Sequence, residues 1–486
     1  MKNCVLDLVQ EKQKAKKMLP LSFKITDLND SQNEVIKAVY NNTLVCCSAP
    51  AGNGKSECII NLVIDFLMKG KRVLVCSKQD RAVDVIYERL QKLGIEGLAF
   101  RFGAKNSNVA MASYILDLIE QKVNLKHNNG NIIKALFKKE EIIEALKTKR
   151  ANKIKEVLAD TEKRKTLITL SKALLQNNKV KREKILKTID FDCILDLMPC
   201  MCINLQNIGD ILPLEKGQWD LVLVDEAAQC TTNIAISAMY RAQKMALFSD
   251  RAQLAPLIWL ERKKEQAFLT KFDVPQDLQL SWAYTKNSLF DFCSFYAESS
   301  VLLDTHYRCV ANLMEFPNKE FYNNACKIVK PAKDGAIRKV FIEGAKVETN
   351  KHLNYKEAEK AIEILKDIIK DCKKKSEKKS IGLICPFSNM AKYVQTRIME
   401  EIPYNDIEDF EILASSIFSF QGSEKDVILW LTTITDDSHR AMRTFLENSH
   451  TFCVACTRAK EQMIILYSAT KLNGGLLDRY LNSIPA

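Results

Sequence analysis

A loop near residue 50 has the residue types of a phosphate-binding site. The segment Ala49-Pro50-Ala51-Gly52-Asn53-Gly54-Lys55-Ser56 matches the pattern G-x-x-x-x-G-K-[ST] except at Ala49, where the pattern has glycine. Gly54 would let backbone N–H groups close on phosphate oxygens, Lys55 would reach the β- and γ-phosphates, and the Ser56 hydroxyl could ligate Mg²⁺. The same residues also fit an ordinary polar turn, so the loop by itself leaves both interpretations open.

Two acidic residues follow an apolar run later in the chain. Asp225 and Glu226 come directly after Leu221-Val222-Leu223-Val224. Asp225 could hold Mg²⁺, and Glu226 could orient and deprotonate an attacking water, which are the two acid roles in nucleoside-triphosphate hydrolysis. A strand-end Asp-Glu pair can instead cap the next helix. Because a phosphate-loop pattern precedes the pair, we expect hydrolysis.

These residues follow strand-like segments, so parallel sheets must position them. Apolar runs alternate with helix-like segments in two blocks, which predicts an α/β fold with two parallel sheets in two domains. A short helix is expected near residues 4–18, before the first block. The expected strands are 43–47, 73–77, 198–202, 220–224 and 245–248 in the first block, and 339–343, 381–385, 412–417, 427–433 and 463–467 in the second.

The net charge of +12 is concentrated in one segment. Residues 105–190 contain 20 Lys and Arg against 10 Asp and Glu, whereas the rest of the chain contains 52 against 50. Such a surplus is expected where a protein contacts a phosphate backbone, although a solvated lysine-rich helical face would look the same. The region from about 105 to 197 is nearly free of Gly and Pro, and its apolar spacing predicts a helical insertion. That spacing includes Ile132, Ile133, Leu136, Phe137, Ile142, Ile143 and Leu146.

Composition excludes several classes of protein. The 16 cysteines lack the short regular framework of a secreted disulfide protein, which favours a reducing compartment. The pairs Cys200/Cys202 and Cys453/Cys456 have no second pair at zinc-ribbon spacing. No signal peptide is evident, and no apolar run approaches the ~18 residues that a membrane span needs. We therefore expect an intracellular protein of the cytoplasm or nucleus with no membrane partner.

The acidic pair belongs to a longer ordered pattern. Asp225-Glu226-Ala227-Ala228-Gln229 is followed by Ser249-Asp250-Arg251-Ala252-Gln253-Leu254-Ala255-Pro256, and together they resemble motifs of the superfamily 1 helicases. The remaining motifs of that family have similar segments in the same order, at residues 28–32, 73–84, 303–309, 316–322, 381–387, 419–426 and 454–460. The closest resemblance is to the 5′→3′ (1B-type) branch that contains the nonsense-mediated-decay RNA helicase and senataxin.

This resemblance implies two RecA-like P-loop domains with ATP and Mg²⁺ as cofactors and single-stranded RNA or DNA as partner. The corresponding organisation is an N-terminal helix at 1–21, a first RecA-like domain at 22–298 with the basic helical insertion at about 105–197, and a second RecA-like domain at 299–486. No motif identifies a protein partner.

The resemblance also assigns roles by matching position. Gln32 would read the adenine and Tyr307 would stack on it. Gly52, Asn53, Gly54, Lys55 and Ser56 would form the phosphate loop, with Ser56 and Asp225 on Mg²⁺ and Glu226 as base. Gln253 would sense the γ-phosphate, Arg308 and Arg458 would reach it from the second domain, and Glu424 would contact the ribose.

Several positions depart from the family pattern. Ala49 would be strained at positive φ, so we expect it at negative φ. Asn53 stands where the family usually has Thr, and Ser249 stands where it has Gly. His306 replaces the Gln that usually precedes Tyr307. Only 27 residues precede the segment at 28–32, so the stalk and β-barrel of relatives are expected to be absent, and the insertion is a candidate substitute for their grip on nucleic acid.

Four functions are compatible with these features to different degrees. The leading hypothesis is an ATP-dependent helicase or translocase, and the main alternative is an ATP-gated clamp or ribonucleoprotein remodeller without processive unwinding. A signalling or metabolic P-loop NTPase would lack a use for Gln32, Gln253 and Arg458. A regulatory pseudo-ATPase is disfavoured by the intact Lys55 and Asp225. RNA and DNA are not distinguished, because no motif declares a contact to a 2′-hydroxyl.

Overall fold

A computed structural model describes residues 4–10, 23–95, 97–103, 105–120, 138–256, 258–348 and 350–484. The chain forms two compact units. The first comprises residues 1–49, 54–250 and 255–303, and the second comprises 50–53, 251–254 and 304–486. Two short loop segments therefore group with the second unit although their neighbours in sequence belong to the first.

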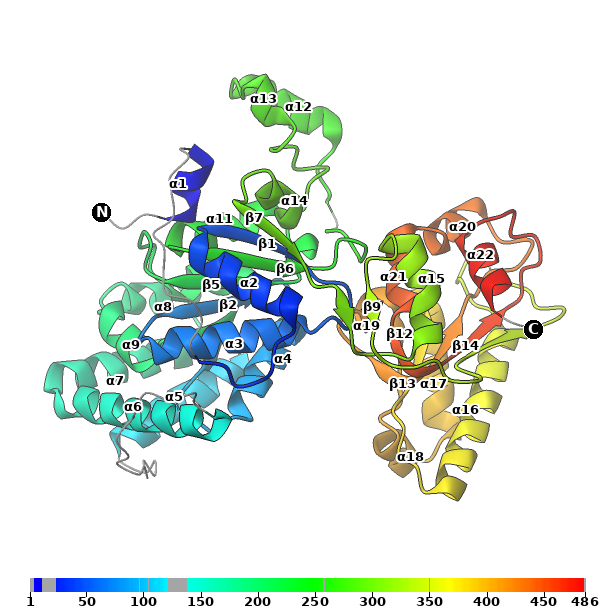
Figure 1. Cartoon of the computed structure of the whole chain (residues 1–486), viewed down its shortest axis with the longest axis horizontal. Helices are drawn as coiled ribbons and strands as arrows, with labels where there is room; N and C mark the ends of the chain where they lie inside the picture. The colour runs from blue at the N-terminus through cyan, green and yellow to red at the C-terminus, as the bar shows by residue number, and fades with distance from the viewer. Residues whose placement is uncertain are drawn as a thin grey trace. The chain divides into compact units, whose positions relative to one another are not determined.

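A seven-stranded parallel sheet forms the centre of the first unit, in the order β3-β4-β2-β5-β6-β1-β7 (Figure 1). Its longer strands are almost continuously apolar because helices cover both faces, as is usual for parallel sheets. The strands are β1 (Leu44–Ser48), β2 (Val73–Ser77), β3 (Phe100–Phe102), β4 (Cys200–Asn204), β5 (Leu221–Asp225), β6 (Met245–Ser249) and β7 (Ser299–Leu302).

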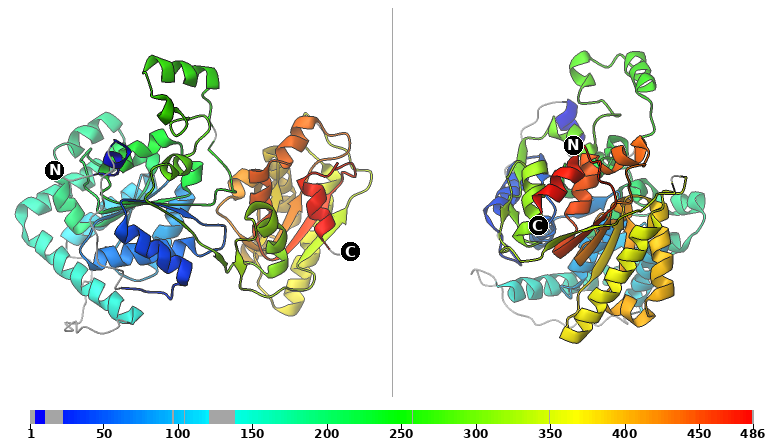
Figure 2. Two further views of the ribbon diagram at one scale, coloured as in Figure 1. Left: turned by 45° about the horizontal axis from the view of Figure 1, so that its top comes forward. Right: turned by 90° about the vertical axis from the view of Figure 1, so that its right-hand side faces the viewer.

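Helices lie over both faces of this sheet (Figure 2), and each face buries a separate hydrophobic core. Alternate residues of each strand point to opposite faces, so that Val45 and Cys47 of β1 join one core while Leu44 and Cys46 join the other. The first core is covered by α2 (Asp30–Asn41), α3 (Lys55–Met68) and α4 (Asp80–Gln91). The second is covered by helices that include α5 (Lys105–Ile119), α7 (Thr161–Leu175), α9 (Phe191–Leu197), α10 (Ile208–Ile211), α11 (Thr232–Arg241) and α14 (Leu289–Ser294).

The predicted insertion is helical wherever it is described. Between β3 and β4 lie α5, α6 (Lys139–Ala159), α7, α8 (Lys179–Leu186) and α9. Ile142 and Leu146 of α6 are buried in the core that α3 and α4 share. Ile132, Ile133, Leu136 and Phe137 lie outside the described residues. Of the helix expected near residues 4–18, α1 (Val5–Gln10) is described, and residues 11–18 lie outside the described ranges.

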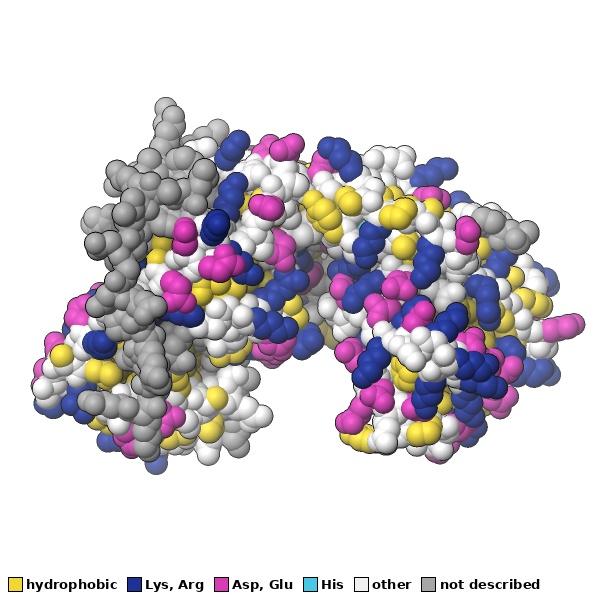
Figure 3. Space-filling model, turned by 60° about the horizontal axis from the view of Figure 1, so that its bottom comes forward, with side chains coloured by type: hydrophobic (Ala, Val, Ile, Leu, Met, Phe, Trp, Pro, Cys, Tyr) yellow, Lys and Arg dark blue, Asp and Glu magenta, His cyan; other side chains and the backbone are white. Residues whose placement is uncertain are grey.

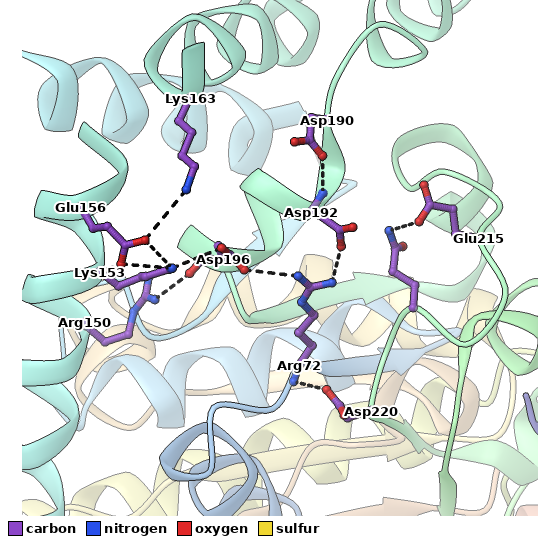
Figure 4. A network of polar contacts seen from close by, with 11 residues as sticks. Arg72, Arg150, Lys153, Glu156, Lys163, Asp190, Asp192, Asp196, Glu215 and Asp220 are labelled. Atoms are coloured by element: carbon purple, nitrogen blue, oxygen red, sulfur yellow. Dashed lines mark hydrogen bonds and ion pairs between the residues drawn. The ribbon is translucent and has the colours of Figure 1, made fainter. Parts of the chain in front are cut away.

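A network of charged side chains also joins the insertion to the sheet domain (Figure 4). Arg72, which precedes β2, contacts Asp192 and lies 3.3 Å from Asp196, both on α9. Lys153 of α6 pairs with Asp196 at 3.2 Å and with Glu156 at 3.0 Å. The insertion is therefore an integral part of the first unit.

The second unit contains a five-stranded parallel sheet in the order β10-β14-β13-β11-β12. Its strands are β10 (Ile337–Phe341), β11 (Ile381–Cys385), β12 (Leu413–Ser416), β13 (Lys425–Leu431) and β14 (Ala459–Tyr467), and a small two-stranded sheet pairs β8 (Thr305–His306) with β9 (Lys327–Ile328). Two cores again lie on opposite faces. They are covered by α15 (Ala311–Phe321), α16 (Tyr355–Lys375), α17 (Ser388–Glu401), α18 (Tyr404–Asp409), α19 (Ile417–Phe420), α20 (Arg440–Leu446), α21 (Ser449–Cys456) and α22 (Leu476–Ser483).

The two parallel sheets confirm the predicted α/β class and two RecA-like domains, and all ten expected strands are present to within a few residues. Two strands of the first sheet were not expected. β3 has only three residues and contains an arginine, and β7 is a partly exposed edge strand, so neither produces an apolar run. Because β7 pairs with β1, the first unit extends to Leu303, past the boundary after residue 298 that the sequence suggested.

Within the described ranges, every helix is too short or too polar to cross a membrane.

Candidate active site

The phosphate loop connects β1 to α3 through two glycines in left-handed conformations. Gly52 and Gly54 have φ of +87° and +78°, which glycine adopts without a steric penalty. Ala49 is not among the residues with positive φ, and its N–H donates to the Ser249 carbonyl at 2.7 Å. Alanine is thus compatible with the backbone at the first position of the pattern, as expected.

The second half of the loop forms the start of α3. Gly54 is the N-cap residue, and Lys55 and Ser56 are the first two residues of this 14-residue helix. The first turn of an α-helix carries N–H groups that have no partner within the helix, and the helix dipole favours negative charge there. This geometry is suited to binding phosphate.

Lys55 contacts both acidic residues at the end of β5, Asp225 and Glu226. Its Nζ lies 2.8 Å from Oδ1 of Asp225 and forms a second ion pair with Glu226. Burial lowers the pKa of Lys55, but the charges of Asp225 and Glu226 outweigh burial and raise it above its usual range. Burial raises the pKa of Asp225, and Lys55 offsets part of that rise. The sequence separates these residues by 170 positions, and the fold brings them into one cluster.

Glu226 is held in a defined orientation. Its backbone is left-handed with φ of +55°, a conformation uncommon outside glycine, and its N–H donates to Asp225 Oδ1 at 2.9 Å. Gln229 Nε2 donates to Glu226 Oε2 at 3.0 Å, and the side chain of Gln79 contacts that of Gln229. Gln79 and Gln229 were not among the predicted site residues, although each lies inside a family-like segment.

The oxygen atoms around Lys55 suit Mg²⁺. Mg²⁺ prefers hard oxygen ligands and commonly takes one or two carboxylates together with substrate phosphates. Asp225 supplies a carboxylate and Ser56 a hydroxyl at the neighbouring helix start. In this structure the Lys55 ammonium pairs with the Asp225 carboxylate, so this carboxylate already holds a cation.

Gln32 is committed to local contacts. It is buried and forms a capping box with Asn29 at the start of α2, donating its N–H to Asn29 Oδ1 at 2.8 Å and accepting the Asn29 N–H at 3.0 Å. Its Nε2 also donates to the Gly54 carbonyl at 3.3 Å. Gln32 therefore supports the phosphate loop, and its reading of adenine stays a prediction.

The second unit gathers the two motif arginines around Thr457. Arg308 pairs with Glu424 at 2.5 Å and donates to the Thr457 carbonyl at 3.4 Å. Arg458 is 2% exposed and donates to the Val454 carbonyl at 3.0 Å and to Thr457 Oγ1 at 2.8 Å. Although burial opposes it, the charge of Arg308, assisted by Lys460 and Arg458, lowers the pKa of Glu424.

The remaining predicted residues of the second unit differ in exposure. The Tyr307 ring is 40% exposed, and its N–H donates to the Gly52 carbonyl at 3.0 Å. Gln253 is buried at 5% exposure, and Glu424 serves as the ion-pair partner of Arg308. The structure therefore groups Gln32, Gly54, Lys55, Ser56, Asp225 and Glu226 in the first unit, and Gly52, Asn53, Gln253, Tyr307, Arg308, Glu424 and Arg458 in the second.

Two departures from the family pattern contact each other. His306 Nδ1 lies 3.1 Å from Asn53 Oδ1, so Nδ1 carries the proton and donates. Nε2 then accepts from the Cys309 N–H at 3.2 Å. Burial, with the charge of Arg308, lowers the pKa of His306 to about 4, and the ring is neutral near pH 7. Asn53 and His306 thus act as a hydrogen-bonded pair at the tip of the loop.

Replacing Gly52 by alanine will weaken nucleotide binding and lower stability. A Cβ there would lie 2.5 Å from His306 Cε1 and 2.6 Å from Arg308 Cβ, in addition to the ~1–2 kcal/mol cost of left-handed backbone. Gly94→Ala is the matched control, because Gly94 has φ of +65° and nothing within 4 Å of its added Cβ. Thermal unfolding and calorimetric titration with ADP should show a larger loss for Gly52→Ala. If the two variants lose the same thermal stability and the same affinity for ADP, the close packing of Gly52 against His306 and Arg308 is unimportant.

His306→Gln will reduce the sensitivity of the protein to acid. The folded-state pKa of about 4 lies below the ordinary 6.5, so the unfolded chain binds this proton first as pH falls. The neutral ring contributes about 3 kcal/mol to the free energy of unfolding. This contribution is fully present above pH 6.5 and is lost as the pH falls toward 4. Urea unfolding of parent and variant at pH 7 and pH 4.5 should show the variant gaining relative to the parent in acid. If the free energies of unfolding of parent and variant differ by the same amount at both pH values, the histidine is not buried in its neutral form.

Comparison with known proteins places both units in described families. Two family models, each described as an AAA domain, match residues 27–260 and 285–470. An uncharacterised ATP-dependent helicase of Methanocaldococcus jannaschii is 23% identical over 95% of this chain and 71% of its own length. The DNA polymerase alpha-associated DNA helicase A of Saccharomyces cerevisiae is 25% identical over 92% of this chain and 65% of its own.

A regulator of nonsense transcripts 1 homolog of Neurospora crassa is 24% identical over 92% of this chain but only 38% of its own length. The chain therefore spans 71%, 65% and 38% of the lengths of these three relatives. The matched domains and relatives agree with the ordered motifs from residue 28 to residue 460, and they confirm the resemblance of the chain to the superfamily 1 helicases related to the regulator of nonsense transcripts 1.

Proposed function

We propose that this chain hydrolyses ATP, with Mg²⁺, to move along single-stranded RNA or DNA and to unwind duplexes. The observation that carries the proposal is the cluster of Lys55, Asp225 and Glu226 at the N-terminus of α3, next to a loop with two glycines in left-handed conformations. These are the groups that phosphoryl transfer to water requires: a phosphate-binding cation, a metal-binding acid and a base. The names of the relatives, which are ATP-dependent helicases, support the same reaction.

In this proposal Lys55 exchanges partners when ATP binds. The ammonium that now neutralises Asp225 and Glu226 would move to the β- and γ-phosphates. Ser56 and Asp225 would hold Mg²⁺, which neutralises charge on the phosphate oxygens when bound. Glu226, oriented by Gln229, would accept a proton from the attacking water.

The second unit would supply the remaining groups. Arg308 and Arg458 would stabilise charge that develops on the γ-phosphate, as arginine fingers do. Tyr307 offers an exposed ring on which adenine could stack, and Gln253 would respond to the γ-phosphate. The pairing of Glu424 with Arg308 favours a role for Glu424 in orienting that arginine, alongside the ribose contact inferred from its motif.

The insertion is the proposed grip on the nucleic acid strand, but much of its charge is already paired. Lys147, Lys153, Lys163, Lys165 and Lys179 each pair with an acidic residue, and Figure 3 shows basic and acidic side chains mixed over one face of the protein. Three exposed lysines on α8 and directly after it have no ion-pair partner among the described residues: Lys181, Lys184 and Lys187.

Because Ile142 and Leu146 of α6 are buried in a core of the first unit, deleting the insertion would disturb the fold, and charge reversal is the better test. We expect Lys181→Glu, Lys184→Glu and Lys187→Glu together to weaken binding of single-stranded oligonucleotides and to lower its salt dependence. Each lost phosphate contact reduces the slope of log K against log salt by ~0.7. If the affinity and the slope of log K against log salt are both unchanged, α8 does not contact the nucleic acid.

Strand displacement tests the proposed function. The full chain should separate a labelled duplex carrying a single-stranded overhang when ATP is present, with a preference for a 5′ overhang. ATP turnover without displacement on any overhang would instead indicate an ATP-gated clamp that remodels ribonucleoprotein.

We also propose that the protein acts in the cytoplasm or nucleus. All 16 cysteines are buried, and their spacing lacks the regular framework of a secreted disulfide protein, which suits a reducing compartment. Fractionation of cells that express the protein should recover it there.

A further inference from the structure

A helical arm stands away from the sheet of the first unit (Figure 1). It contains α12 (Arg262–Lys271) and α13 (Gln276–Gln279), between the end of the Gln253 segment and α14. The two matched family models end at residue 260 and begin at residue 285, so α12 and α13 lie between them, and Trp259 lies at the end of the first match. The motifs that assign the ATP site therefore leave the arm without a role.

Large aromatic side chains of the arm are exposed to solvent. Trp259 is 91% exposed, Phe272 68% and Phe268 51%. Burying such rings is favourable, so exposed aromatic patches on a folded surface commonly mark binding sites. Lys271 Nζ lies 5.5 Å from the centre of the Phe272 ring, which places a cation beside one of them.

Helix α12 presents positive charge without exposed negative charge. Arg262, Lys263, Lys264 and Lys271 are all exposed. The one acidic residue of the helix, Glu265, is buried and accepts the backbone N–H of Thr285 at 2.9 Å. Outside the helix the arm has three exposed acidic residues, Glu261, Asp273 and Asp277, and Glu261 lies 3.7 Å from Lys264. The exposed positive charge is therefore confined to α12 itself.

The arm is attached by specific contacts, so its surface is an ordered one. Besides the bond from Glu265 to Thr285, Trp282 Nε1 donates to the Tyr296 hydroxyl at 2.9 Å. The Trp282 ring also packs edge-on against Phe292 of α14 at 6.0 Å. Asn287 Nδ2 donates to the Leu280 carbonyl at 2.7 Å and closes the base of the arm. Trp259, Phe268 and Phe272 take no part in these attachments and remain available.

We propose that this arm binds single-stranded nucleic acid, with bases stacking on Trp259, Phe268 and Phe272 and phosphates pairing with the cations of α12. Exposed aromatic rings beside exposed positive charge are the combination that sequence-tolerant single-strand sites use. A docking protein would not need four cations beside the rings. The inference rests on the proposed function, because it names a second contact for the same strand.

Intrinsic fluorescence gives a direct test on the full chain. Trp219 and Trp430 are fully buried, so the accessible tryptophans are Trp259 and the half-buried Trp282. Titration with a single-stranded oligo(U) or oligo(dT) should quench tryptophan emission, and Trp259→Phe should lose most of that quenching. A duplex of the same length, whose bases are already stacked, should quench much less.

Affinity measurements by fluorescence anisotropy separate stacking from charge. Phe268→Ala combined with Phe272→Ala should weaken binding at least about fivefold for each ring removed. Arg262→Ala, Lys263→Ala and Lys264→Ala together should lower the slope of log K against log salt by ~2. Phe341→Ala is the matched control, since Phe341 is a 45% exposed phenylalanine of the second unit. Circular dichroism would verify that each variant folds.

The outcomes separate the arm from the proposed function. If the parent binds single strands and the arm variants bind them equally well with unchanged quenching, the arm proposal is wrong and the proposed function stands. If the parent binds no nucleic acid, both fail. If the variants change only the self-association of the protein, measured by analytical ultracentrifugation, the arm is an interface between copies and the proposal is likewise overturned.

Discussion

Replacing Lys55 by alanine will lower the rate of ATP hydrolysis by at least about 100-fold, the loss expected when one group that stabilises transition-state charge is removed. The variant loses the cation proposed to contact the phosphates. It also leaves Asp225 and Glu226 without the ammonium that contacts both of them, and uncompensated buried carboxylates are costly. We therefore expect the pKa of Asp225 to rise further in this variant, because burial already raises it.

Steady-state phosphate release at saturating ATP measures the effect. Lys71→Ala is the matched control, because Lys71 also pairs with an aspartate, Asp220, at 2.9 Å but lies outside the phosphate loop. Thermal unfolding of both variants would separate loss of catalysis from loss of folding. A folded Lys55→Ala protein that hydrolyses ATP at the parental rate would show that the loop is a polar turn.

Arg458→Ala will lower kcat by about 10³–10⁵-fold, the range for loss of an arginine finger. In this structure the guanidinium is buried and bonded to Val454 and Thr457, so it is already fixed in place before any ligand binds. A fixed donor needs no reorganisation when charge develops on the γ-phosphate. Affinity for ADP, which lacks that phosphate, should change little.

Arg443→Ala provides the comparison for this prediction. Arg443 also belongs to the second unit and donates to backbone carbonyls, including Thr435 at 2.8 Å, but it lies outside the family-like segments. Single-turnover hydrolysis should be near parental for Arg443→Ala and very slow for Arg458→Ala. If both variants lose activity in parallel with thermal stability, Arg458 is a structural arginine.

The sheets could be predicted from sequence because their strands are buried on both faces. Strands such as β2 and β11 are apolar at nearly every position, and this produces a continuous signal. β7 gave none because it lies at an edge and alternates exposed with buried residues. The arm was also not predicted, since α12 is short and its aromatic residues remain exposed instead of following a buried face.

The candidate site was predicted in its residues but not in its contacts. Lys55, Asp225 and Glu226 were expected to act together, and the fold joins them. The hydrogen bond between Asn53 and His306 and the pairing of Arg308 with Glu424 could not be predicted, because both depend on side chains far apart in sequence. Gln32 shows the opposite case, since its local sequence, Asn29 to Gln32, is that of a capping box that uses the same side chain.

The most direct test of the central claim is the rate of ATP hydrolysis by the full chain with single-stranded RNA, with single-stranded DNA and with neither. A nucleic-acid-driven motor should hydrolyse ATP slowly alone and much faster with at least one kind of strand, and chelation of Mg²⁺ should abolish both rates. The kind of strand that stimulates would identify the substrate. Turnover that is indifferent to RNA and DNA would contradict the account and indicate a P-loop NTPase with another role.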